Sequence, residues 1–189
     1  MQDKKVLIFV GMPGAGKTVC VNYLKNKGLP CAYFGGITLN EMKKRSLEVN
    51  ETNEKLVRED IRAKEGNDAY AVRIIKQVED FFSQGSNHVV VDGLYSWTEY
   101  RAFKQKFGAS ALIIAVVTSL GVRHERLAKR EVRPLTEEAA TARDYAEIEN
   151  LEKGGPIANA DYFLLNEGSA EDLGNALANL LPKAGVDLT

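Results

Sequence analysis

Residues 6–18 read VLIFVGMPGAGKT, five apolar residues followed by Gly11-Met-Pro-Gly-Ala-Gly16-Lys17-Thr18. The second half matches the phosphate-loop pattern G-x-x-x-x-G-K-[ST]. Its glycines let the chain wrap around an anion with backbone N–H groups pointing inward, and the helix that follows presents its positive end to the same anion. The apolar run predicts a buried strand leading into the loop, which is the context that this chemistry needs. The stretch therefore predicts a nucleoside triphosphate site.

Each position of the loop has a physical task. Lys17 supplies a mobile charge for the β- and γ-phosphates, and Thr18 supplies a hydroxyl for Mg²⁺. A later apolar run ends in Asp92, at the point where a carboxylate can hold Mg²⁺ through water. We therefore predict ATP and Mg²⁺ as cofactors and Thr18 and Asp92 as the metal site. The predicted ATP-binding residues of the loop are Gly11, Pro13, Gly14, Ala15, Gly16, Lys17, Thr18 and Val19.

Further apolar runs, bounded by turn residues, recur along the chain with helical patterns between them. Such continuous runs are typical of buried parallel strands. They predict an α/β fold of three layers, with about five parallel strands and helices on both faces. Together with the phosphate loop this resembles the P-loop NTPase fold, which implies the strand order 2-3-1-4-5. The runs are Val6–Val10, Cys31–Phe34, Val89–Val91, Leu112–Val117 and Tyr162–Leu165.

Two polar stretches interrupt this alternation. Residues 35–85 lie between the second and third runs and contain the helical patterns Glu54–Lys64 and Asp68–Phe82. Residues 123–153 lie between the fourth and fifth runs and are rich in arginine. Because neither a repeat nor a linker divides the chain, we expect one kinase-like domain over residues 1–189.

Composition narrows the class of partner. The 189 residues include 25 basic and 26 acidic side chains, for a net charge of −1, so we expect no nucleic-acid surface and no polybasic membrane anchor. Cys20 and Cys31 lack the spacing of a metal or disulfide framework. The first apolar run is too short for a signal peptide or a membrane span. These features predict a cytoplasmic protein with a small-molecule partner, and they leave monomer and dimer equally open.

Other P-loop classes lack their markers here. A GTPase needs Asp-x-x-Gly after the third strand and Asn-Lys-x-Asp later, whereas this chain has Asp92-Gly93-Leu94-Tyr95 and no Asn-Lys-x-Asp. Helicase and AAA-type motors need a longer chain and an acidic pair at the magnesium strand. A small kinase remains.

Four blocks carry a family resemblance: Gly11-Met-Pro-Gly-Ala-Gly-Lys, Arg62-x-x-x-Gly66-x-Asp68-Ala69, Arg143-Asp144-x-x-Glu147, and Ala160-Asp161-Tyr162 through Asn166-Glu167-Gly168. With them the chain resembles the adenylate-kinase-like and dephospho-CoA-kinase-like P-loop kinases. It is most similar to an uncharacterised adenylate-kinase-related group best known from archaea. The resemblance implies that residues 35–85 bind the acceptor, that residues around 126–136 form a lid over the triphosphate, and that residues 166–168 lie near the base.

The arginines of the lid region are candidates for charge stabilisation. Phosphoryl transfer spreads negative charge over the moving group, and guanidinium groups stabilise that charge well. Arg123, Arg126, Arg130 and Arg133 recur every three or four residues, so one helix would carry them near one face. We predict Lys17, Arg126, Arg130 and Asp92 as catalytic residues, with Arg133 and Arg143 next. Arg126, Asn166 and Gly168 are the further predicted ATP contacts.

The acceptor side is less defined. We predict Arg62, Arg73, Thr38 and Gly93 as acceptor-binding residues. A phosphate acceptor is already ionised and needs no general base, whereas a hydroxyl acceptor usually needs a carboxylate. Residues 34–38 after the second strand contain none, which favours a nucleoside monophosphate. Residues 94–97 lack the arginine that adenylate-kinase-type enzymes usually carry there, so a dephospho-CoA-type kinase and a regulatory ATPase with a protein partner stay open as alternatives.

Overall fold

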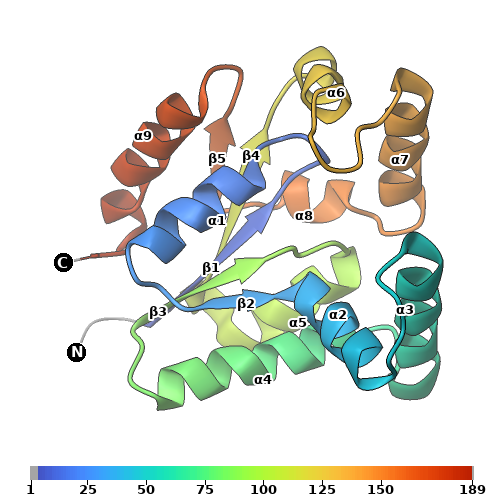
Figure 1. Ribbon diagram of the computed structural model, residues 1–189. Coiled ribbons are helices and arrows are strands. Elements are labelled where there is room, and N and C mark those ends of the chain that lie inside the picture. The colour runs from blue at the N-terminus through green and yellow to red at the C-terminus, as the bar shows by residue number, and fades with distance from the viewer. Residues whose placement is uncertain (1–3, 189) are drawn as a thin grey trace.

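The computed structural model describes residues 4–188, and their core is one parallel sheet (Figure 1). Its order is β2-β3-β1-β4-β5, which confirms the predicted topology. Each strand lies within one or two residues of its predicted run. The strands are β1 (Lys5–Val10), β2 (Cys31–Tyr33), β3 (His88–Asp92), β4 (Ala111–Val117) and β5 (Tyr162–Leu165).

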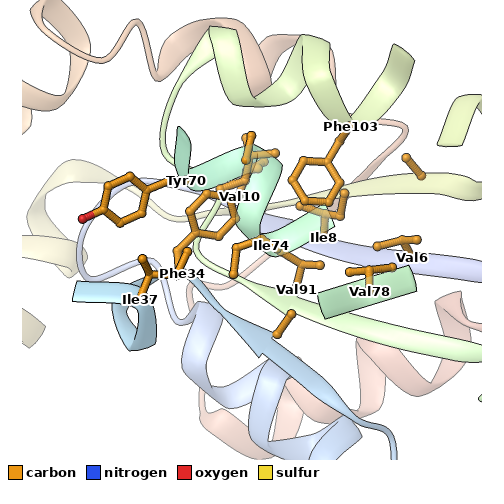
Figure 2. Packing of buried hydrophobic residues seen from close by; sticks show 14 of the residues in the cluster. Val6, Ile8, Val10, Phe34, Ile37, Tyr70, Ile74, Val78, Val91 and Phe103 are labelled. Atoms are coloured by element: carbon orange, nitrogen blue, oxygen red, sulfur yellow. The ribbon is translucent and has the colours of Figure 1, made fainter. Parts of the chain in front are cut away.

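The central strand β1 explains why these runs are apolar throughout. It pairs with β3 on one side and with β4 on the other, so its residues meet protein on both faces of the sheet. Ile8 and Val10 pack into one buried cluster, and Leu7 and Phe9 into the other. Figure 2 shows the first of these clusters, where Phe34 and Phe103 pack near Ile8 and Val10. Alternate residues thus stabilise both helical layers.

Helices cover both faces of the sheet, as predicted. On one face lie α1 (Lys17–Asn26) and α9 (Ala170–Leu180), which contribute Leu24 and Leu177 to the core. The other face is covered by α2 (Phe34–Lys44), α4 (Ala69–Ser83) and α5 (Trp97–Phe107). Two short 3₁₀ turns, Gly108–Ser110 and Pro182–Ala184, precede β4 and follow α9. Among residues 4–188, none of the helices combines the length and the apolarity that crossing a membrane requires.

The remaining helices come from the two polar stretches or lie directly beside them in the sequence. They are α3 (Glu51–Glu65), α6 (Leu120–Ala128), α7 (Glu137–Glu149) and α8 (Gly154–Ala158). Asn50 caps α3 by accepting a 2.9 Å hydrogen bond from the Asn53 N–H. The expectation that one helix carries four arginines is wrong. Because α6 ends at Ala128, Arg130 and Arg133 lie on the segment that follows it.

Candidate active site

The phosphate-binding loop joins the carboxyl end of β1 to the start of α1 (Figure 1). Three side chains hold its carbonyl oxygens. Ala15 accepts hydrogen bonds from Thr118 Oγ1 at 3.1 Å and from Asn166 Nδ2 at 2.7 Å. Pro13 accepts one from the Arg123 guanidinium at 3.0 Å. These donors come from the ends of β4 and β5 and from α6, so segments remote in sequence fix the shape of the loop.

Lys17 is the half-buried cation of the loop. Its Nζ donates to the carbonyl oxygen of Gly11 at 2.7 Å and to that of Met12 at 3.2 Å. Burial, followed by the nearby charge of Lys153, lowers the pKa of Lys17 from 10.5 to about 7. An anion that displaces these carbonyls would favour the charged ammonium. Lys17 is therefore arranged to respond to a bound phosphate.

The loop opens into a pocket of about 430 Å³, here called the phosphate pocket. Five cationic side chains and two carboxylates line it, an excess of positive charge that suits a polyanion. They come from the phosphate-binding loop and the start of α1, from the end of β3, from α6 and α7, and from the segments that follow these two helices. The lining residues are Pro13, Gly14, Gly16, Lys17, Thr18, Tyr33, Asp92, Tyr95, Arg126, Arg130, Arg143, Glu147 and Lys153.

Arg126 ties α6 to the segment after β5. Its guanidinium donates to the carbonyl oxygens of Asn166 at 3.0 Å and Gly168 at 2.8 Å. The Asn166 side chain is turned onto the loop and is buried, so its amide stabilises the loop. Contact of Asn166 or Gly168 with a nucleotide base stays a prediction.

Thr18 at the start of α1 and Asp92 at the end of β3 both line the phosphate pocket. Burial raises the pKa of Asp92, while the positive charges of Lys17 and Lys25 oppose this rise. Mg²⁺ in phosphoryl-transfer sites keeps several waters and binds one or two carboxylates together with phosphate oxygens. Within residues 4–188 no group of three or more His, Cys, Asp or Glu side chains forms an all-protein cage. One hydroxyl, one carboxylate and a phosphate therefore fit the needs of Mg²⁺ here.

A second pocket, of about 840 Å³, adjoins the first and is called the acceptor pocket below. Four arginines and three glutamates line it, a small excess of positive charge, together with tyrosines and apolar side chains from α2, α4 and the neighbouring segments. Thr38 Oγ1 and the Tyr70 hydroxyl form a 2.8 Å hydrogen bond in its wall, and the Arg62 guanidinium lies 5.3 Å from the centre of the Tyr70 ring. The lining residues are Tyr33, Phe34, Gly35, Thr38, Leu39, Val49, Glu54, Arg58, Arg62, Tyr70, Tyr95, Glu99, Arg133, Leu135, Arg143, Glu147 and Leu151.

The two pockets share four wall residues, which are Tyr33, Tyr95, Arg143 and Glu147. In the wall of the acceptor pocket, Arg133 on the segment after α6 donates a hydrogen bond to Glu54 of α3 at 3.0 Å. This contact links the two stretches that the sequence assigns to lid and acceptor binding. A ligand in one pocket can thus meet a ligand in the other.

The predicted site residues divide into those that line these pockets and those that do not. Arg126, Arg130 and Arg143 line the phosphate pocket, and Arg62, Thr38 and Arg133 line the acceptor pocket. In the described chain, Arg73 lines neither pocket and pairs instead with Glu65. The other predicted residues that lie outside both linings are Gly11, Ala15, Val19, Gly93, Asn166 and Gly168.

Several wall residues were missed at the level of sequence. Lys153 is only 1% exposed although it stands in a Glu-Lys-Gly-Gly turn that is typical of a protein surface. Glu147 belongs to a block that we noted for its resemblance, without a site assignment. Tyr33, Glu54 and Arg58 had no signal beyond their position within a predicted strand or helix. Only tertiary structure brings these residues together.

Gly16 has the least room of the loop glycines for a side chain. Its φ is +103°, and an added Cβ would lie 2.2 Å from Asn166 Nδ2. We expect Gly16→Ala to lower the free energy of unfolding by about 1–3 kcal/mol and to weaken nucleotide binding, because the Asn166 bond to the loop must shift. Gly28→Ala is the matched control, since Gly28 has a φ of +87° with nothing within 4 Å. Equal losses of stability in urea unfolding of the two variants would contradict this.

A comparison with family models finds a match to an AAA domain over residues 7–149. Among curated proteins, the UPF0200/UPF0201 protein of Archaeoglobus fulgidus is 30% identical over 185 residues, covering 96% of this chain and 56% of the relative. The chain thus spans little more than half the length of that relative. A UPF0200 protein of Thermococcus kodakarensis is 36% identical over 170 residues, covering 88% of this chain and 91% of the relative.

Solved structures share the fold at low identity. TT1252 from Thermus thermophilus superposes with a TM-score of 0.67 at 18% identity, covering 96% of this chain and 98% of that one. Shikimate kinase from Bacteroides thetaiotaomicron superposes with a TM-score of 0.58 at 9% identity, covering 95% of this chain and 97% of that one. Dephospho-CoA kinase from Campylobacter jejuni superposes with a TM-score of 0.55 at 16% identity, covering 96% of this chain and 97% of that one. The neighbours have the P-loop kinase fold, and the chain belongs both to the AAA-domain family of the matching model and to the UPF0200 proteins.

Proposed function

We propose that the chain binds ATP with Mg²⁺ and transfers the γ-phosphoryl group to a nucleoside monophosphate or a similar phosphate-bearing nucleotide. The observation that carries this proposal is the shared wall between the phosphate pocket and an acceptor pocket lined by four arginines. An enzyme that only hydrolyses ATP needs no such second pocket. The arginines favour an anionic acceptor, and the tyrosines and aliphatic side chains favour a largely planar, apolar body.

In the proposed reaction an acceptor phosphate oxygen attacks the γ-phosphorus, and the bond to the β,γ-bridging oxygen breaks, so that ADP leaves with the electron pair. Lys17 neutralises the β- and γ-phosphates, while Arg126, Arg130 and Arg143 line the space where negative charge spreads. Thr18 and Asp92 would hold Mg²⁺, which would neutralise part of the charge of the triphosphate. The bond from Arg133 to Glu54 joins the segment after α6 to α3 beside the acceptor pocket.

A hydroxyl acceptor is the second candidate, and one observation favours it. Asp92 and Glu147 place two carboxylates in the phosphate pocket, although the segment after β2 has none. Either of them could accept the hydroxyl proton. The names of the fold neighbours, a shikimate kinase and a dephospho-CoA kinase, belong to enzymes of this acceptor class.

The first experiment is to measure ADP release from ATP·Mg²⁺ by the purified protein, with a panel of possible acceptors. The panel holds ribo- and deoxyribonucleoside monophosphates, dephospho-CoA and shikimate. Stimulation well above basal hydrolysis by a monophosphate supports the proposal. Stimulation by dephospho-CoA or shikimate would instead support phosphoryl transfer to a hydroxyl acceptor. Slow turnover that needs Lys17 and responds to no acceptor would leave a regulatory ATPase.

Arg62 and Arg73 form a matched pair for testing the acceptor pocket. Arg62 lines the pocket beside Tyr70, whereas Arg73 pairs with Glu65 outside it. We expect Arg62→Ala to raise KM for the stimulating acceptor by about 10–100-fold, the loss of one charge-assisted hydrogen bond. Arg73→Ala should change that KM by less than about twofold. Steady-state kinetics at saturating ATP measure both, and equal effects would count against the assignment.

The lowered pKa of Lys17 predicts a pH dependence of ATP binding. Above pH 7 the free protein increasingly holds neutral Lys17, because its pKa is about 7. A bound triphosphate favours the ammonium, so binding takes up a proton and affinity falls as pH rises, by up to about tenfold per pH unit. Calorimetry in two buffers of different ionisation enthalpy measures that uptake. Constant affinity from about pH 7 to about pH 9 would refute it.

A further inference from the structure

Lys153 is a buried lysine that the reaction proposed above does not use. It precedes α8, it is 1% exposed, and it lines the phosphate pocket. Its Nζ donates to Glu147 Oε2 and lies 4.9 Å from the centre of the Tyr95 ring. Removing a lysine from water is costly, so a buried lysine at a pocket wall calls for a compensating partner or a ligand.

Glu147 alone does not compensate the local positive charge. Its carboxylate also accepts a 3.2 Å hydrogen bond from Arg143 Nε, so it is shared between two cations. Lys17 adds a third positive charge nearby, and the repulsion between Lys17 and Lys153 contributes to the lowered pKa of Lys17. Burial likewise lowers the pKa of Lys153. The carboxylates of Asp92 and Glu99 favour the charged forms of Lys17 and Lys153, but burial outweighs them and leaves both pKa values lowered. A bound polyanion would therefore favour the charged form of both lysines.

The position of Lys153 suggests which part of the polyanion it meets. Both of its contacts, Glu147 and Tyr95, belong to the shared wall, while Lys153 itself lines only the phosphate pocket. In a transfer between the pockets, the γ-phosphoryl group is the part of ATP that reaches the shared wall. Lys153 thus lies on the ATP-binding side of the place where the γ-phosphoryl group would pass to the acceptor.

Resting on the proposed function, we propose that Lys153 is a second catalytic lysine, which contacts the γ-phosphoryl group as it moves from ATP to the acceptor. Glu147 is a positioning residue that holds Lys153 and Arg143 at the shared wall. When ATP binds, the γ-phosphate oxygens take up the ammonium donors that Glu147 holds in the free protein. The competing explanation is that Lys153 serves only to neutralise buried Glu147.

Two variants separate these explanations. Lys153→Met keeps the length of the side chain and removes its charge, and Lys153→Met/Glu147→Gln also removes the buried carboxylate that would be left with Arg143 alone. The double variant keeps the test valid if the single one folds poorly, because no uncompensated carboxylate is then buried at Lys153. The readouts are calorimetric binding of ADP·Mg²⁺ and of a non-hydrolysable ATP analogue with Mg²⁺, and single-turnover ADP formation.

A catalytic Lys153 predicts that both variants bind ADP nearly as the wild type does and bind the ATP analogue about tenfold more weakly, with ADP formation slowed about 100-fold. Recovery of analogue binding and turnover by the double variant to within about twofold of wild type would overturn the proposal and leave a neutralising role. The wild type and Lys17→Ala, measured alongside, test the proposed function separately. If the wild type binds neither nucleotide, or Lys17→Ala binds both unchanged, the proposed function itself fails.

Discussion

Lys17→Ala is expected to lower ATP-dependent ADP formation by about 100–1,000-fold and to weaken binding of ATP·Mg²⁺, which would be the largest effect of any single substitution in this site. Lys17 is the cation at the start of α1 whose Nζ already sits in the loop, bonded to Gly11 and Met12. The substitution removes a charge that the loop holds close to the β- and γ-phosphates. Because Lys17 is bonded only through these neutral carbonyls in the free protein, its loss should leave the fold in place.

The matched control is Lys76→Ala, which removes an exposed lysine on α4 that lines neither pocket of the described chain. It should leave turnover within about twofold of wild type. Coupled-assay kinetics and calorimetric titration with ATP·Mg²⁺ provide the readouts, and thermal unfolding checks that Lys17→Ala remains folded. Unchanged turnover in a folded Lys17→Ala protein would show that any measured activity arises outside this loop.

The part of the site that the sequence predicted well is the part that is local in sequence. A strand, a glycine-rich turn and a helix start follow one another within residues 6–18, so one short segment contains the residues that determine the structure of the loop. The sheet order was predictable for a related reason. Continuous apolar runs identify buried parallel strands, and the resemblance to P-loop kinases supplied their order, which the structure confirms.

The acceptor side was harder because it depends on which way helix residues face. Arg62 on α3 and Arg73 on α4 look alike in sequence, each beside acidic neighbours. Packing of Tyr70 against Thr38 and Arg62 orients one arginine into the acceptor pocket, while Glu65 pairs with the other outside it. Periodicity gives the face of a helix, but only the neighbouring elements decide what that face meets.

Lys153 and Glu147 were missed for a further reason. Sequence statistics place lysine and glutamate on surfaces, whereas both residues are buried here, where the turn between α7 and α8 brings Lys153 against Glu147 and Tyr95. The four arginines 123, 126, 130 and 133 illustrate the same limit. Their spacing fits one helix face, yet the helix ends at Ala128, and the arginines serve a buried ion pair, the phosphate pocket and the acceptor pocket instead.

The second large effect is expected at Arg123, which is 6% exposed and forms a two-bond ion pair with Asp144 of α7, itself 4% exposed. Burial acts to raise the pKa of Asp144, but hydrogen bonds from Arg123 and His124 outweigh it and hold that pKa below its usual range. Arg123→Met leaves the carboxylate buried with His124 as its remaining partner. We expect a loss of about 3–5 kcal/mol in the free energy of unfolding, measured in urea.

The double variant Arg123→Met/Asp144→Leu separates the two tasks of Arg123. Replacing both charges with apolar side chains should recover most of the lost stability, since buried ion pairs are often no better than well-packed hydrophobic residues. It cannot restore the 3.0 Å bond from Arg123 to the Pro13 carbonyl, which fixes the phosphate-binding loop from α6. Nucleotide affinity should therefore stay about tenfold below wild type in a protein of nearly native stability. Recovery of both properties together would mean that Arg123 stabilises the fold alone, and that Thr118 and Asn166 suffice to hold the loop.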